Sequence, residues 1–196
     1  ALGAVFLVAC FPPLFKAWFY EVAIKSYLII ALYFLHHVCD GSAQIAEVSV
    51  DLETGEISVE KVTDAHDCGL AINRTSVEGQ MEGSVSMGLG EALFEEVKFD
   101  SQGRILNASL AEYKIPTALD VPPVESLIIE SREPNGPYGA KEVGEGAIMP
   151  TIPAILNAVY DATGVRINEL PLTPERVWKA LKEKERRDDR RKEGES

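Results

Sequence analysis

The fold is decided by Ile45-Ala-Glu-Val-Ser-Val50 and Glu56-Ile-Ser-Val-Glu-Lys-Val62, two short runs with the composition of β-strands. Between them lie the turn residues Glu53-Thr-Gly55, in which glycine allows the chain to reverse sharply. Two strands joined by such a turn form a β-hairpin. From Gln44 onward the chain is therefore expected to be an ordinary α+β domain.

Working outward from this hairpin, the sequence predicts three helices, a second hairpin and a further strand. The first helix is expected at Val77 to Phe94, with Thr75 or Ser76 as its N-cap. The second is expected at Thr151 to Ala162, where Gly164 ends it, and the third begins at Thr173-Pro174. The second hairpin is expected to turn at Asp100-Ser-Gln-Gly103, and the further strand is Ser126-Leu-Ile-Ile-Glu130. The fold class is thus α+β, with hairpins packed against helices.

The chain divides into three parts by composition. Residues 1–41 form an atypical hydrophobic segment that stays unassigned, residues 42–184 form the domain, and residues 185–196 are expected to be a charged, disordered tail. The uncharged runs in the first part are shorter than the roughly 20 apolar residues that span a bilayer. They also lack the basic start of a signal peptide, so neither a membrane span nor a signal peptide is predicted.

Charge and cysteine content exclude several classes of function. The chain has 31 acidic and 19 basic residues, for a net charge of -12, and it has no basic patch. Phosphate binding needs clustered Lys and Arg, so nucleic acid is not an expected partner. The three cysteines show no C-x-x-C spacing and the three histidines no H-x-x-E spacing, so no metal ligated by protein side chains is predicted. A reducing, cytoplasmic setting fits best.

A loop rich in glycine carries the strongest chemical signal. Residues 136–146 read Gly-Pro-Tyr-Gly-Ala-Lys-Glu-Val-Gly-Glu-Gly, which places two carboxylates among four glycines. Glu145 has glycine on both sides, where the main chain can fold around a bound group, so it is the better candidate for a buried general base than Glu142. Lys141 could hold a carboxylate ionised or meet an anionic cofactor. The alternative is an exposed turn with solvated charges.

The predicted helix after Thr75 carries a second signal. Gly79 and Gly83 lie one turn apart, and each interior glycine costs about 1 kcal/mol relative to alanine. Together they clear a strip where a backbone or a flat ligand can approach, and Gln80 beside it can both donate and accept hydrogen bonds. The alternative is that the glycines only permit tight packing of helix on sheet and that Gln80 is a surface residue.

Four spaced motifs together resemble the C-terminal part of the large subunit of molybdenum hydroxylases, the xanthine dehydrogenase and aldehyde oxidase family. The motifs are Asp67-Cys-Gly-Leu-Ala-Ile-Asn73, Val77-Glu-Gly-Gln-Met-Glu-Gly83 with Gly88-Leu-Gly90, Tyr113-Lys-Ile-Pro116, and Gly139-Ala-Lys-Glu-Val-Gly-Glu-Gly146. The likeness runs from about Ser42 to Lys184. It implies that this part is the C-terminal half of a two-part molybdopterin-binding domain.

The resemblance also implies a reaction and its residues. The reaction is hydroxylation of an electron-poor carbon, of purine or aldehyde type, with oxygen from water. The family's base, the glutamate of its Val-Gly-Glu motif, maps onto Glu145, and the glutamine that hydrogen-bonds at the cofactor maps onto Gln80. Gly144 matches family backbone that lies against the cofactor, and Lys141 is the fourth expected site residue. In most members no side chain ligates the metal.

The cofactor implied is molybdenum-molybdopterin, with the cytosine dinucleotide as one candidate form, while [2Fe-2S] clusters and FAD would lie on partner chains or domains. The rest of the large subunit would also be a partner, since the family's large subunit is several times longer than this chain. The chain by itself is therefore expected to be an inactive fragment of an enzyme. Two alternatives stay open: the hydroxybenzoyl-CoA reductase branch, which shares the Gly-Ala-Lys-Glu-x-Gly-Glu-Gly loop, and a non-catalytic scaffold.

Overall fold

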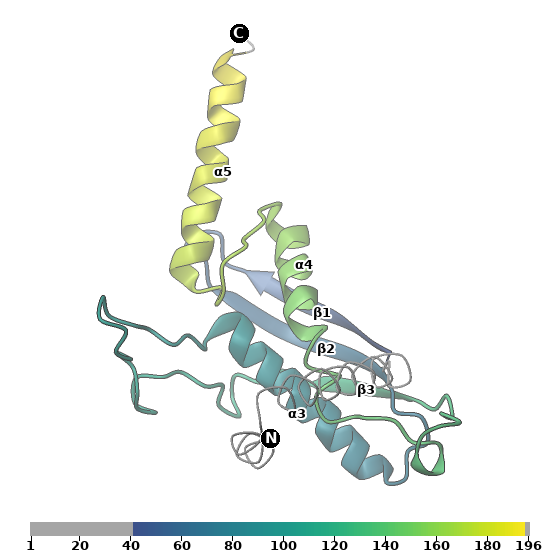
Figure 1. Cartoon of the computed structure of the whole chain (residues 1–196). Helices are drawn as coiled ribbons and strands as arrows, with labels where there is room; N and C mark the ends of the chain where they lie inside the picture. The colour runs from purple at the N-terminus through teal and green to yellow at the C-terminus, as the bar shows by residue number, and fades with distance from the viewer. Residues whose placement is uncertain (1–40, 195–196) are drawn as a thin grey trace, which may run out of the picture. The chain divides into compact units, whose positions relative to one another are not determined.

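A computed structural model describes residues 41–194, which form a small sheet and helices (Figure 1). The elements are β1 (Ser42–Val50), β2 (Ile57–Asp67), α3 (Arg74–Leu93), β3 (Val124–Ile129), the 3-10 turn η1 (Pro137–Gly139), α4 (Thr151–Thr163) and α5 (Pro174–Gly194). The predictions for residues 1–40 lie outside the described part. The α+β class is confirmed.

The three strands form one sheet in the order β1-β2-β3. β1 and β2 pair antiparallel, as the predicted hairpin requires, with a bulge between Glu47 and Val48. The predicted third strand is also present, and it pairs parallel to β2, with Asp64 opposite Ser126. Two parallel neighbours need a crossover connection, and α3 and the segment that follows it provide one.

Two helices cover one face of the sheet. α3 contacts β2 and β3, α4 contacts β1, and the two helices contact each other. They come so close that a Cβ atom on Gly88 would lie 2.5 Å from Cβ of Thr151, which explains this glycine. The main apolar core lies between α3, α4 and the start of α5. Its buried members are Leu89, Ala92, Ile155, Val159, Val165, Leu172, Val177 and Leu181.

One helix ends where the sequence predicted, and another begins earlier than predicted. α4 is closed by Gly164 in the left-handed region at φ 67°, as predicted. α3 begins earlier than predicted, and its N-cap is neither Thr75 nor Ser76. The cap is Asn73, whose side-chain oxygen accepts the backbone N–H of Ser76 at 3.1 Å. Asparagine is at least as good a cap as serine or threonine, so the earlier start is physically favoured.

The predicted second hairpin is present only as a turn. Residues 95–121, here called the arm, extend away from the sheet (Figure 1). Asp100 and Gly103 make the expected turn, but the pairing beyond it is a single bridge between Phe99 and Ile105. Both of these side chains are more than half exposed, so no apolar face is buried that would stabilise longer strands.

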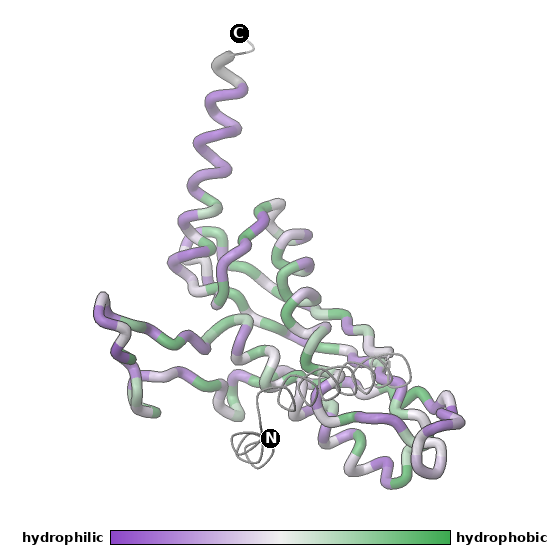
Figure 2. The backbone as a smooth tube through the Cα atoms, in the orientation of Figure 1, coloured by the Kyte–Doolittle hydropathy of each residue, from purple (hydrophilic) through white to green (hydrophobic). Residues whose placement is uncertain are grey.

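α5 continues through Gly194 and therefore includes most of the segment predicted to be a disordered tail. Its far half is hydrophilic all round (Figure 2). Charged residues of opposite sign at helical spacing support it, for example Lys179 with Glu175 at 2.7 Å and Lys182 with Glu185 at 2.8 Å. Within residues 41–194, no helix combines the length and the apolar character needed to cross a membrane.

Candidate functional site

Asp67, the last residue of β2, holds the start of the glycine loop through Lys141. Its carboxylate accepts hydrogen bonds from the Lys141 ammonium at 2.7 Å, from the N–H of Gly69 at 3.0 Å, and from the N–H of Ser131 at 3.1 Å, as well as from the Ser131 hydroxyl. Burial raises the pKa of Asp67, but the Lys141 ammonium and these other donors outweigh it and hold the pKa well below its ordinary value. Lys141, also largely buried, thus performs the first role expected of it, holding a carboxylate ionised.

Backbone hydrogen bonds tie the loop after β2 to the glycine loop. The Leu70 N–H donates to the Gly139 carbonyl and the Lys141 N–H donates to the Cys68 carbonyl, both at 2.8 Å. Gly69 makes this approach possible. It lies in the left-handed region at φ 67°, and a Cβ atom there would overlap the Gly139 carbonyl oxygen and lie 2.8 Å from the Lys141 nitrogen.

The glycine loop folds around a carboxylate, as its glycines suggested, but that carboxylate belongs to Glu142. The Glu142 side chain accepts the backbone N–H of Glu145, and it accepts that of Gly146 at 3.2 Å. This turn leaves the Glu145 side chain exposed. The expectation that Glu145 is buried is therefore wrong for this chain, because the chain's own acid occupies the pocket of N–H groups.

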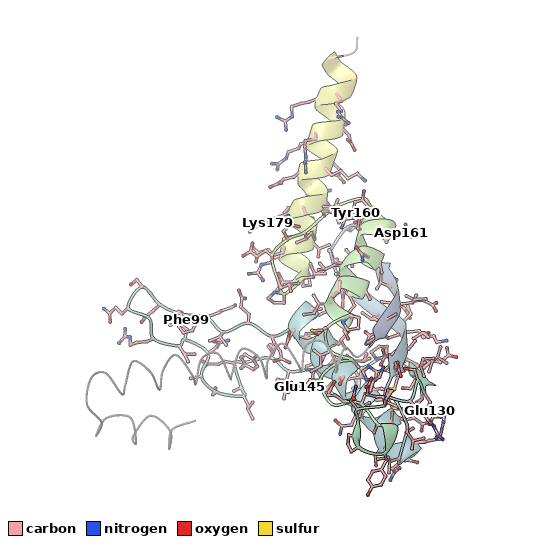
Figure 3. The ribbon with its side chains drawn as sticks, turned by 45° about the vertical axis from the view of Figure 1, so that its right-hand side comes forward. Phe99, Glu130, Glu145, Tyr160, Asp161 and Lys179 are labelled. Carbon is pink, nitrogen blue, oxygen red and sulfur yellow. The ribbon has the colours of Figure 1, made fainter. Side chains whose placement is uncertain are left out.

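Gln80 lies next to this loop, on the exposed side of α3. A Cβ atom placed on Gly144 would stand 3.8 Å from the Gln80 side-chain oxygen and 3.4 Å from Oε1 of Glu142. The structure thus brings Gln80 close to Gly144, which is far away in the sequence, and Glu145, labelled in Figure 3, is the next residue of the same loop. Of the four expected site residues, only Lys141 is directed elsewhere, toward Asp67.

The glycine strip on α3 is open. A Cβ atom on Gly79 or Gly83 would meet no atom of the described residues within 4 Å. Close packing against α4 accounts for Gly88, but no packing of helix on sheet or on helix accounts for Gly79 and Gly83. Gly79, Gly83 and the side chain of Gln80 form a surface on which a planar polar group could lie against the backbone.

Buried side chains hold the loop from below. Val143 packs against a small apolar cluster, whose buried members are Cys68, Val77 and Met81. Beside it, Asp64 and His66 on β2 are both fully buried. Burial raises the pKa of the Asp64 carboxyl, and a hydrogen bond with the Ser42 hydroxyl at 3.2 Å opposes this only in part.

Several of these supporting residues escaped the sequence analysis. Asp67 stood in a quoted motif, but nothing in the sequence indicates that it pairs with Lys141, 74 positions later. Ser84 is different, because it follows Gln80 by one helical turn and so shares its face. Its hydroxyl donates to the Gly144 carbonyl at 2.8 Å. The helical spacing could therefore have identified Ser84.

The site offers an exposed carboxylate, a side-chain amide and accessible backbone. Within the described residues, no three His, Cys, Asp or Glu side chains gather where they could hold a metal ion. What the arrangement can do chemically is accept a proton at Glu145 and hydrogen-bond a flat polar group at Gln80. The open strip and the amide fit a bound, flat organic group.

Comparison with known proteins shows which family the chain resembles. Residues 34–122 match the molybdopterin cofactor-binding domain family. The chain is 43% identical over 133 residues to a xanthine dehydrogenase molybdenum-binding subunit of Escherichia coli O157:H7. This alignment covers 67% of this chain and 18% of the relative. It is 41% identical over 138 residues to the nicotine 6-hydroxylase large subunit of Paenarthrobacter nicotinovorans, covering 69% of this chain and 17% of the relative.

Among solved structures, quinoline 2-oxidoreductase from Pseudomonas putida 86 superposes with a TM-score of 0.66 and 37% identity, covering 69% of this chain and 18% of that one. The chain therefore spans less than a fifth of the length of these relatives.

Proposed function

The chain belongs to the molybdenum hydroxylase family and matches its molybdopterin-binding part, and from this premise we propose that it is the C-terminal part of the molybdenum-cofactor subunit of a hydroxylase. The reaction is oxidation of an electron-poor carbon, of purine or aldehyde type, with oxygen from water. The enzyme works in the cytoplasm. Its electrons leave through Fe-S and FAD partners, and the rest of the large subunit completes the pocket.

The observation that carries this proposal is that Gln80, beside the open strip of α3, lies close to Gly144, the loop residue that precedes Glu145. Gln80 and the backbone at Gly144 hold the cofactor, while Glu145 faces the reacting group. When bound, molybdenum-molybdopterin supplies the redox chemistry by taking two electrons from the substrate carbon. The protein supplies the binding surface, the orientation and a proton acceptor.

Glu145 is the general base in this proposal. Its carboxylate takes the proton from the attacking oxygen, and for this it must lie within about 3.2 Å of that oxygen when the substrate is bound. In the described chain its side chain is exposed, as is that of Gln80. The remaining part of the large subunit would close over this surface and exclude water, which strengthens the interactions of the carboxylate.

Lys141 has a supporting role. It binds Asp67 at 2.7 Å and the Ser131 hydroxyl at 3.1 Å, and so fixes the first residues of the glycine loop. It serves cofactor binding by keeping that loop in place.

The test is a pair of substitutions in the assembled complex with its partner chains. Glu145→Gln keeps size and hydrogen bonding but cannot accept a proton, so turnover should fall by about 10²-fold or more while molybdenum and pterin content stay unchanged. Gln80→Ala should instead lower molybdenum and pterin content. A complex in which neither substitution has its effect would support the alternative of a scaffold, which holds no pterin and is indifferent to Glu145.

A further inference from the structure

The loop that carries Glu145 is held by side chains from three different elements. Each donates a hydrogen bond to a backbone carbonyl of residues 142–147. The three bonds run from Ser84 Oγ to the Gly144 oxygen at 2.8 Å, from His66 Nε2 to the Glu142 oxygen at 3.1 Å, and from Gln44 Nε2 to the Ala147 oxygen at 2.6 Å. The donors come from α3, β2 and β1, so the loop is fixed on both sides of Glu145.

Two of these donor side chains are buried inside the domain. Ser84 is 2% exposed and His66 is fully buried. Because a carbonyl oxygen only accepts, the proton of His66 must be on Nε2. Ala147 is buried and Glu142 and Gly144 are partly buried, so a carbonyl that lost its donor would cost free energy, and each bond holds its carbonyl in place.

The loop needs such support because of its own sequence. Gly144 and Gly146 flank Glu145, and glycine has more backbone freedom than any other residue. A catalytic carboxylate must nevertheless stay within about 0.5 Å of its productive position. The Glu145 carboxylate can stay in one position on such a flexible backbone only if neighbouring residues fix the loop.

We propose that Ser84, His66 and Gln44 are positioning residues, which hold the backbone of residues 142–147 so that the Glu145 carboxylate is aimed at the reacting group. This inference rests on the proposed function of Glu145. None of the three needs to touch the cofactor or the substrate. They act by hydrogen bonds to the main chain beside the base.

The test uses the assembled, cofactor-loaded complex and substitutions that remove one donor. Ser84→Ala deletes a hydroxyl, and Ser86→Ala, two residues along the same helix, is the matched control, because Ser86 makes no hydrogen bond to the loop. Displacing a catalytic group by about 1 Å costs up to about 10²-fold in rate. We expect kcat of Ser84→Ala to fall at least about tenfold at unchanged KM and molybdenum content, with Ser86→Ala unaffected.

A second pair tests His66. His66→Phe removes the donor, whereas His66→Gln keeps an N–H group that can reach the same carbonyl. Rescue of kcat by glutamine but not by phenylalanine would support positioning. Hydrogen exchange gives a readout independent of activity: the amides of Glu145 and Gly146 should exchange about tenfold faster in Ser84→Ala than in the control, because the loop opens more often.

The outcomes separate the two proposals. If Glu145→Gln lowers turnover but Ser84→Ala behaves like Ser86→Ala, the positioning role is wrong and the role of Glu145 stands. If activity in Ser84→Ala falls only in proportion to molybdenum content, the hydrogen bond is merely structural and the inference is overturned. If Glu145→Gln leaves turnover unchanged, the base assignment fails and the positioning role fails with it.

Discussion

Gly69 offers a sharp test of how the loop after β2 and the glycine loop are joined. It lies at φ 67°, where an L-residue is strained, and a Cβ atom there would overlap the Gly139 carbonyl. Gly103 is the natural control, since it has φ 78° but no atom within 4 Å of a Cβ. Gly69→Ala and Gly103→Ala thus share the backbone strain and differ only in the contact between loops.

The magnitudes follow from the contacts. Alanine in the left-handed region costs about 1–2 kcal/mol, and the loss of unfolded-chain entropy returns about 0.4–1 kcal/mol, so Gly103→Ala should lower the free energy of unfolding by about 1 kcal/mol. At Gly69 the two loops must also separate. This disturbs two backbone hydrogen bonds of about 1 kcal/mol each, so the total should reach about 3 kcal/mol.

Urea unfolding of the full chain, followed by circular dichroism, measures both values. The account predicts that Gly69→Ala shifts the midpoint two to three times as far as Gly103→Ala, at equal slope. Equal shifts for the two variants would refute the close approach of the loops, and with it the placement of the glycine loop beside α3.

Three further predictions concern the strip, the ion pair and the loop support. Gly83→Ala should raise the free energy of unfolding of the chain by about 1 kcal/mol, because nothing obstructs a Cβ atom there. Gly83→Leu should instead lower the molybdenum content of the assembled complex, measured by metal analysis. Full molybdenum occupancy in Gly83→Leu would mean that no cofactor lies on the strip. Asp67→Asn should cost about 2 kcal/mol at pH 7 in urea unfolding. Because the pKa of Asp67 is lowered on folding, this contribution is present above about pH 4 and is lost as the pH falls further, so wild type and variant should converge in acid; a difference that does not depend on pH would contradict the ion pair. Met81→Ala, which empties a fully buried position beneath Val143, should cost about 2–5 kcal/mol in the same assay, and a loss below about 1 kcal/mol would show that the cluster is not packed.

The sequence was sufficient for the parts of the fold that local rules determine. The hairpin β1-β2 follows from strand composition around Gly55, and the end of α4 follows from Gly164, since both depend on residues close in the chain. The second hairpin was overpredicted. Its turn is local, but the strands beyond Asp100 and Gly103 need a partner surface that the described chain lacks.

The sequence named candidate site residues but not the side chains that support them. Gln80 and Glu145 were named from glycine spacing and, with Gly144, from the resemblance; their roles stay predictions, while the structure places Gln80 close to Gly144. The pairing of Asp67 with Lys141 depends on contacts between distant segments, which no local pattern encodes. For the same reason the sequence could not reveal that the loop encloses Glu142 and leaves Glu145 exposed.

A structure of the complete complex with cofactor and a substrate analogue would show whether Glu145 faces the reacting group. The quantity to measure is the distance from the Glu145 carboxylate to the nearest oxygen bound at the molybdenum. We predict a distance of about 3.2 Å or less, with the Gln80 amide also in hydrogen-bonding reach of the cofactor. A Glu145 side chain that faces bulk water, with no pterin on the strip beside Gly79 and Gly83, would contradict it.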